Sequence, residues 1–141
     1  MMQWFWAFLG SLGFSLLYNV RGKNVFLAAL SGMLGWMVYS FASPRFSNEF
    51  LSYFLAAMVV TLSAEAFARW QKAPATTFLI AGIIPLVPGK ALFYTMRAAV
   101  GAQRGYFLAH GALTLSIALA IAAGIMAASS LMRTLMWRMG K

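Results

Sequence analysis

Hydrophobic residues in this chain come in long runs, separated by short segments that are polar or rich in glycine and proline. A helix needs roughly 20 mostly apolar residues to cross a membrane, and the runs are close to that length. The pattern therefore predicts an all-α, polytopic membrane helix bundle that forms one integral membrane domain over residues 1–141. Five transmembrane segments are expected, at about residues 2–18, 25–41, 49–69, 74–99 and 107–132.

The fourth apolar run, which begins PATTFLIAGIIPLVPG, differs from the others because prolines and glycines interrupt it. Proline lacks a backbone donor and clashes with the preceding turn, so we expect the helix to break at Pro85, Pro88 and Gly89 and to restart near Gly89. Irregular backbone persists in lipid only where protein buries it or it lines a wet cavity. Interrupted spans of this kind point to the binding sites of transporters. If this segment is re-entrant, the chain has four spans instead of five.

The composition supports a membrane protein and argues against several other classes. Hydrophobic residues make up 62% of the chain and charged residues 9%, whereas soluble domains carry about 25% charged residues. The net charge is +9, but the basic residues fall singly or in pairs between apolar runs, which predicts contact with lipid head groups and not with nucleic acid. Cysteine is absent, which excludes disulfides and thiolate chemistry.

No motif for enzyme chemistry is present. The chain lacks HExxH, GxSxG and P-loop patterns, and it has two acidic residues in total, so we expect no enzyme, no metal site and no cofactor. His110 has no second histidine or carboxylate at ligand spacing, and we interpret it as a packing or interfacial residue. Trp36 and Tyr39 are expected near a membrane interface as anchors.

The distribution of positive charge predicts the orientation of the chain. The loop Arg21–Lys23 is expected on the cytoplasmic side, with the N-terminus outside, for either four or five spans. For five spans and for four, seven basic residues lie on the predicted cytoplasmic side and four on the opposite side. The charge distribution therefore does not decide on which side the C-terminus lies. For five spans, the cytoplasmic residues are Arg21, Lys23, Arg69, Lys72, Arg133, Arg138 and Lys141, and the others are Arg45, Lys90, Arg97 and Arg104.

The restarted helix provides a candidate anion site. Its first turn would present free N–H groups and the positive end of the helix dipole, with Lys90 beside them and Thr95 and Arg97 on the next turns. A carboxylate-binding site is one interpretation. The other is that Lys90 and Arg97 extend to lipid head groups. Asn19 could face a substrate path, or it could pack or cap the end of the first helix.

Glu65 and Arg69 are four residues apart on the third predicted helix and can form an ion pair near a membrane surface. The pair is either structural or includes a carboxylate linked to proton or substrate movement. Small residues also recur every fourth position, a pattern that lets helices approach closely, and Gly32 and Gly35 indicate a further tight contact. The two stripes are Ala7, Ser11, Ser15 and Asn19 in the first span, and Ser116, Ala120, Gly124 and Ala128 in the last.

Two blocks of sequence, YNVRGKNVFLAALSGMLGWMVY and AEAFARWQKAPATTFLIAGIIPLVPGKALFYTM, resemble the threonine/serine exporter family. The resemblance runs from about Gly13 through Met96, and the chain is similar to the small, split-subunit branch, which includes a subunit of a bacterial succinate exporter. It implies ion-driven export of small amino acids or dicarboxylates across the bacterial inner membrane, together with a larger membrane subunit. The characteristic family residues carried over by position are Asn19, Pro74, Phe78, Pro85, Pro88 and Gly89.

The sequence thus predicts a subunit of a secondary transporter that exports small carboxylated solutes and joins its partner through the stripes on the first and last spans. Two alternatives remain open. The chain could be a scaffold whose larger partner carries the solute path, or it could form a homo-oligomeric passive channel.

Overall fold

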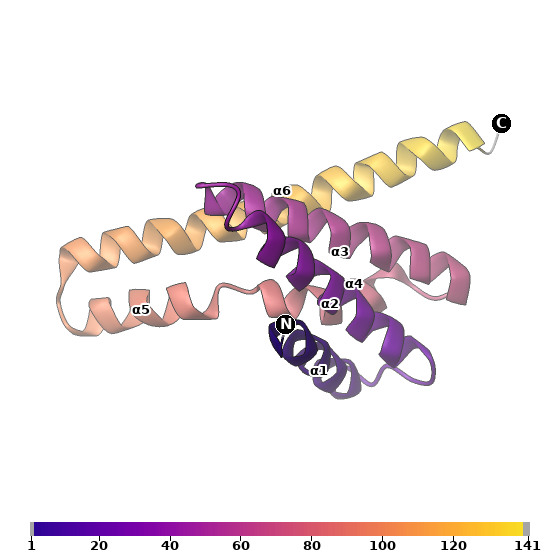
Figure 1. Cartoon of the computed structure of the whole chain (residues 1–141), viewed down its shortest axis with the longest axis horizontal. Helices are drawn as coiled ribbons and strands as arrows, with labels where there is room; N and C mark the ends of the chain where they lie inside the picture. The colour runs from indigo at the N-terminus through magenta and orange to yellow at the C-terminus, as the bar shows by residue number, and fades with distance from the viewer. Residues whose placement is uncertain (1, 140–141) are drawn as a thin grey trace.

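The computed structural model describes residues 2–139, and this part of the chain is helical with no strand (Figure 1). The predicted all-α class is confirmed. Lys141, one of the charges used to predict orientation, lies outside the described residues. The elements are α1 (Met2–Leu17), α2 (Asn24–Ala42), α3 (Glu49–Gln71), α4 (Ala75–Ile83), the 3₁₀ helix η1 (Ile84–Leu86), α5 (Gly89–Val100) and α6 (Arg104–Met139).

Three described helices, α2, α3 and α6, are long and apolar enough to cross a membrane, and α4 and α5 together form a bent fourth candidate. These helices confirm a helical membrane bundle. The apolar helix α1 has 16 residues and rises about 24 Å, less than the hydrocarbon thickness of about 30 Å. A fifth crossing by α1 therefore stays a prediction.

The predicted break in the fourth span is confirmed. Helix α4 ends at Ile83, η1 contains Pro85, and Val87 is extended with φ −60° and ψ 130° before α5 begins at Gly89. The helix axes on either side of the break differ by 57°. Figure 1 shows α5 continuing away from α4 instead of turning back beside it, which favours a broken span over a re-entrant loop.

The last helix begins earlier than expected. The last span was expected to start at about residue 107, but α6 starts at Arg104, so residues 104–106 are helical and not part of the connection between the spans. A three-residue turn is enough because the Gln103 N–H donates to Ala98 O (3.0 Å) and Ala102 adopts φ +52°. Gly105, which falls between the fourth and fifth expected spans, lies in the first turn of the helix.

The centre of the bundle consists of α2, α3 and α4, and small residues let these helices pack closely. Phe78 of α4 is fully buried among alanines of α2 and α3, and Leu86 of η1 is fully buried beside Val60. A β-carbon at Gly35 would collide with Val60 Cγ2, which confirms the tight contact predicted for α2. The fully buried Phe78 and Leu86 hold the segment that precedes the break against the bundle.

Both predicted small-residue stripes are helix-packing faces, but both are filled within the chain. On α1, Ser11 packs against Gly32 of α2. On α6, a β-carbon at Gly124 would lie 2.6 Å from Phe54 O of α3. The expectation that these stripes join a partner is therefore wrong, because the chain's own helices already occupy them. Their buried members are Ala7, Ser11, Ser15, Ala120, Gly124 and Ala128.

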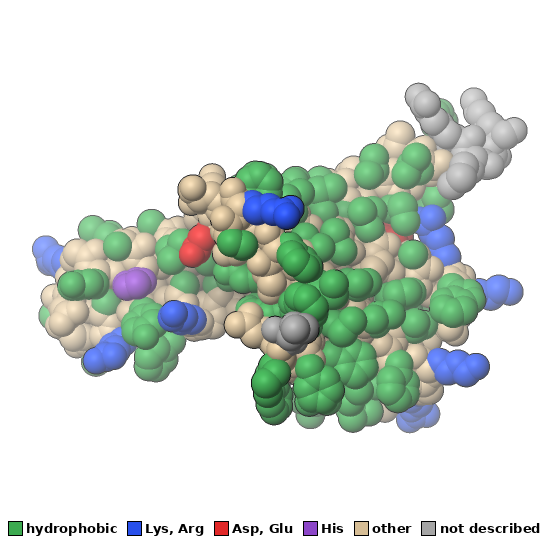
Figure 2. Space-filling model, viewed as in Figure 1, with side chains coloured by type: hydrophobic (Ala, Val, Ile, Leu, Met, Phe, Trp, Pro, Cys, Tyr) green, Lys and Arg blue, Asp and Glu red, His purple; other side chains and the backbone are tan. Residues whose placement is uncertain are grey.

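Helix α5 packs along the N-terminal half of α6, and the two form an arm that extends beyond the α2–α3 loop (Figure 1). The hydroxyl oxygens of Thr95 and Thr114 lie 3.2 Å apart across this contact. The outer face of α5 is apolar and exposed, with Phe93, Met96 and Val100 uncovered. Large hydrophobic side chains cover much of the visible surface in Figure 2, as expected for helices that face lipid.

Candidate functional site

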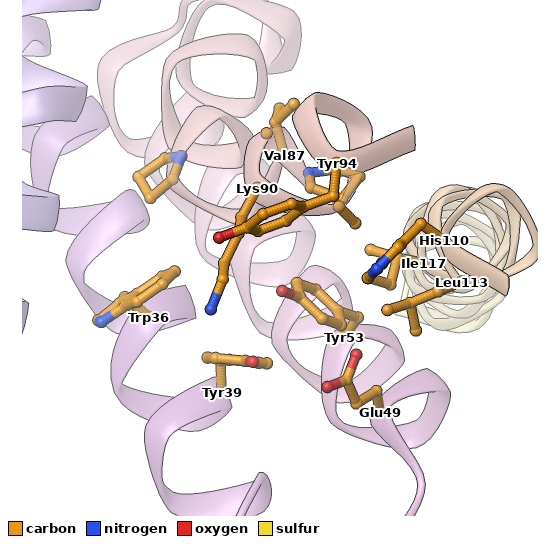
Figure 3. Close-up of a pocket in the computed structure, with 14 residues that line it drawn as sticks. Trp36, Tyr39, Glu49, Tyr53, Val87, Lys90, Tyr94, His110, Leu113 and Ile117 are labelled. Atoms are coloured by element: carbon orange, nitrogen blue, oxygen red, sulfur yellow. The ribbon is translucent and has the colours of Figure 1, made fainter. Parts of the chain in front are cut away.

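An open pocket lies beside the break between α4 and α5, and we call it the break pocket (Figure 3). It has a volume of about 770 Å³, within the range of roughly 300–1,000 Å³ that is usual for small-molecule sites. Its walls come from α2, α3, the break itself, α5 and α6. Residues from most of the length of the chain therefore meet around one interrupted segment.

The predicted residues of the break lie together at this pocket: Pro85, Pro88, Gly89 and Lys90 all line it. The first turn of α5 has no side-chain cap, and no backbone acceptor in the described chain receives the N–H of Lys90 or of Ala91. Ala91 also lines the pocket. Free N–H groups at a helix N-terminus favour an anion, and the ammonium group of Lys90 adds a full positive charge.

In Figure 3 the Lys90 side chain extends into the pocket toward the aromatic residues Trp36, Tyr39 and Tyr53. The ring centroids of Trp36 and Tyr39 are 5.2 Å apart, and those of Tyr39 and Tyr53 are 4.6 Å apart. These side chains form a continuous aromatic wall. We expected Trp36 and Tyr39 only as interface anchors, and no sequence signal placed Tyr53 beside them.

Sequence reasoning also missed Glu49. It is the first residue of α3, and the preceding Asn48 caps that helix by accepting the Phe50 N–H at 3.0 Å. Its carboxylate enters the same pocket as the Lys90 amine (Figure 3). Within the described chain, neither charge has an ion-pair partner within 4 Å. The sequence shows only a helix start at Glu49, and no periodicity links that position to Lys90.

Thr95 and Arg97, the other two predicted residues of α5, do not line the break pocket. The Thr95 hydroxyl donates to Ala91 O at 2.8 Å and lies against Thr114. Arg97 is exposed and lines a separate hollow of about 450 Å³ near the end of the arm. The structure therefore separates Lys90 from Arg97.

Asn19, Glu65 and Arg69 do not line the break pocket either. Asn19 adopts φ +56° just after α1 and its side chain accepts from Arg21 Nε at 3.5 Å, which fits the end-capping interpretation. The predicted ion pair is present, with Arg69 Nη2 3.5 Å from Glu65 Oε2. A role of Glu65 in coupling stays a prediction.

His110 lines the break pocket as part of an aromatic stack on α6. Its ring lies 5.4 Å from Tyr94 and 6.4 Å from Tyr106, centroid to centroid. This stacking confirms the packing role predicted for His110. Across residues 2–139 there is no group of three or more histidine, aspartate or glutamate side chains placed to hold a metal.

The family of this chain is identified by its similarity to known proteins. The model of the family described as "Threonine/Serine exporter, ThrE" matches residues 3–131. This chain belongs to the threonine/serine exporter family. The match extends from α1 through most of α6, so it includes every element that lines the break pocket.

Membership in this exporter family, together with the apolar helices, establishes a membrane protein of a transporter family. No solved structure matches this chain. For a member of the threonine/serine exporter family, the break pocket is the natural candidate for a solute site, because it is concave, aromatic and charged at the interrupted span.

Proposed function

We propose that this chain is a subunit of a secondary transporter that exports small carboxylated solutes across the bacterial inner membrane. The candidate solutes are amino acids such as threonine and serine, and dicarboxylates such as succinate. The observation that carries the proposal is the convergence of Lys90 and the uncapped N-terminus of α5 in the break pocket. A carboxylate there would accept hydrogen bonds from two backbone N–H groups and from the ammonium group.

We further propose that a larger membrane subunit of the same family closes the pocket. Gly89, Lys90 and Glu49 are exposed, so the pocket opens at the surface of this chain. Inverted repeats in transporters place the solute between two halves, and we propose that this chain supplies one of them.

The layout of the loops supports an orientation for the proposed subunit. In Figure 1 the α1–α2 loop and the α3–α4 turn lie at the same end of the bundle, and Figure 2 shows Lys and Arg side chains gathered there. These segments carry Arg21, Lys23 and Lys72. By the positive-inside rule we assign this end to the cytoplasm, with the N-terminus outside.

The test is efflux from preloaded cells that express this chain alone, with its larger partner, or with the partner and Lys90→Ala. Labelled threonine, serine and succinate are measured, and co-purification reports complex formation. We expect efflux only from the pair, and loss of efflux in Lys90→Ala with the complex intact. Lys72→Ala is the matched control, because it removes an exposed basic residue at the opposite end of the bundle.

Other outcomes would favour the alternatives. Unchanged efflux in Lys90→Ala would make this chain a scaffold whose partner holds the anion site. Efflux from this chain alone that persists when the proton gradient is collapsed would indicate a homo-oligomeric passive channel.

A further inference from the structure

The break pocket contains one positive and one negative side chain, and they come from different helices. Lys90 lies in the first turn of α5 and Glu49 in the first turn of α3, and both line the pocket. No ion pair within 4 Å joins them in the described chain. Two opposite charges that face one pocket without pairing leave room for a ligand between them.

The position of Glu49 is only partly explained by the helix it begins. A carboxylate in the first turn is stabilised by the dipole of α3, and the Asn48 cap supports the same turn. These effects account for an acidic residue at this end of the helix. They do not account for its placement in a pocket whose opposite wall carries Lys90 and the free N–H groups of α5.

The wall between the two charges suits a cation near Glu49. Tyr39 and Tyr53 lie with their ring centroids 4.6 Å apart, and Figure 3 shows them between the Lys90 amine and the Glu49 carboxylate. A ligand cation within about 6 Å of a tyrosine ring is attracted to the face of the ring. The pocket therefore offers an anion site at Lys90 and a cation site at Glu49, joined by aromatic surface.

We propose that Glu49 binds the ammonium group of a zwitterionic amino acid whose carboxylate is bound by Lys90 and the N-terminus of α5. This inference rests on the proposed function, because it assumes that the break pocket holds the exported solute. Glu49 then determines specificity. A dicarboxylate would place its second carboxylate beside the carboxylate of Glu49. The repulsion between these two negative charges would oppose its binding.

The experiment measures efflux of threonine and of succinate by the full complex, and the readout is the ratio of the two rates. Glu49→Gln keeps the size of the side chain and removes its charge. We expect the threonine-to-succinate ratio to fall about tenfold, which corresponds to about 1.4 kcal/mol of discrimination. Glu49→Asp should retain the wild-type preference for threonine. Arg45→Gln is the control for the ratio, because it removes an exposed charge of the α2–α3 loop that does not line the pocket.

A second measurement needs no variant, so it applies even if Glu49→Gln does not assemble. The wild-type complex is tested with threonine and with N-acetylthreonine, which keeps the carboxylate and lacks the ammonium. We expect efflux of threonine and none of N-acetylthreonine. Equal efflux of the two compounds would overturn the role of Glu49.

The two proposals fail in distinguishable ways. If Lys90→Ala abolishes efflux of every solute while Glu49→Gln leaves the ratio unchanged, the anion site stands and the inference about Glu49 is wrong. If neither variant changes efflux, the solute does not occupy the break pocket and the proposed function of this chain fails as well.

Discussion

Ser11 of α1 occupies the space that a side chain at position 32 of α2 would need. A β-carbon added at Gly32 would collide with Ser11 Oγ and would lie 2.9 Å from Ser11 Cβ. The same β-carbon would lie 3.3 Å from Gly82 O of α4. Three helices therefore meet at one small residue, and this crossing attaches α1 to the bundle.

We predict that Gly32→Ala destabilises the chain by about 1–3 kcal/mol, because an overpacked crossing forces α1 away from α2. Thermal unfolding of the purified protein in detergent measures the effect. Combining Gly32→Ala with Ser11→Gly should restore part of the lost stability. The second substitution removes the Ser11 side chain and leaves room for the methyl group at position 32. Gly13→Ala is the control, because a β-carbon there has no neighbour within 4 Å.

Ser11 also carries a buried hydroxyl with no hydrogen-bond partner in the described chain. Burying an unpartnered hydroxyl costs free energy, so Ser11→Ala should leave the melting temperature unchanged or raise it. A clear fall in melting temperature would show that the hydroxyl has a partner, such as an ordered water.

A second close crossing predicts a second sensitive glycine. A β-carbon at Gly124 of α6 would lie 2.6 Å from Phe54 O and 2.9 Å from Ala57 Cβ of α3. Backbone oxygen cannot rotate away, so we expect Gly124→Ala to lower the melting temperature, with a cost of about 1–3 kcal/mol. Gly111→Ala on the same helix is the matched control, because its nearest atom is Thr95 Cγ2 at an ordinary 3.6 Å.

The contact between the hydroxyl groups of Thr95 and Thr114 allows a test of how stably α5 packs against α6. The Thr114 hydroxyl has one hydrogen and two acceptors in reach, His110 O of its own helix at 2.8 Å and the Thr95 hydroxyl at 3.2 Å. If that hydrogen goes to Thr95, Thr114→Val removes a bond between the helices, and α5 should separate more easily from α6, by roughly 0.5–1.5 kcal/mol. Hydrogen exchange of the α5 amides measures this as faster exchange. If the hydrogen goes to His110 O, hydrogen exchange of α5 should be unchanged. Thr134→Val should not affect α5, because the Thr134 hydroxyl donates only within α6, to Ser130 O at 3.0 Å.

The ion pair on α3 allows a test of the two interpretations of Glu65. Both side chains are partly exposed, so Glu65→Gln should change the free energy of unfolding by no more than about 1 kcal/mol. If the pair is structural, efflux by the complex should continue. Loss of efflux in Glu65→Gln but not in Arg69→Gln would instead identify Glu65 as a coupling carboxylate.

The features that the sequence predicted correctly depend on local chemistry. Pro85, Pro88 and Gly89 impose a break wherever they occur in an apolar run, and the structure has it at that position. The four-residue spacing of small side chains likewise identified the packing faces of α1 and α6. Spacing does not say which helix fills a face, and for that reason the expected partner contact at these stripes was wrong.

The site was harder to predict because it depends on contacts between distant parts of the chain. Lys90 was expected from its place after the break, but Glu49, Tyr39 and Tyr53 reach it only because α2 and α3 pack beside that break. At Gly105 the sequence was misleading because a single residue was given too much weight. A glycine that looked like a loop residue is tolerated in a helix whose other residues favour it.

The length of α6 has a mechanical consequence. The helix is unbroken from Arg104 to Met139, and at Gly124 it packs directly against the backbone of α3. From Gly124 to His110, on the pocket wall, is about 21 Å, and from Gly124 to Met139 is about 22 Å. A rigid rod that rocks about such a midpoint moves its two ends in opposite directions by similar amounts. A displacement of α6 that widens the break pocket would thus move the C-terminal end of the same helix by a similar distance in the opposite direction.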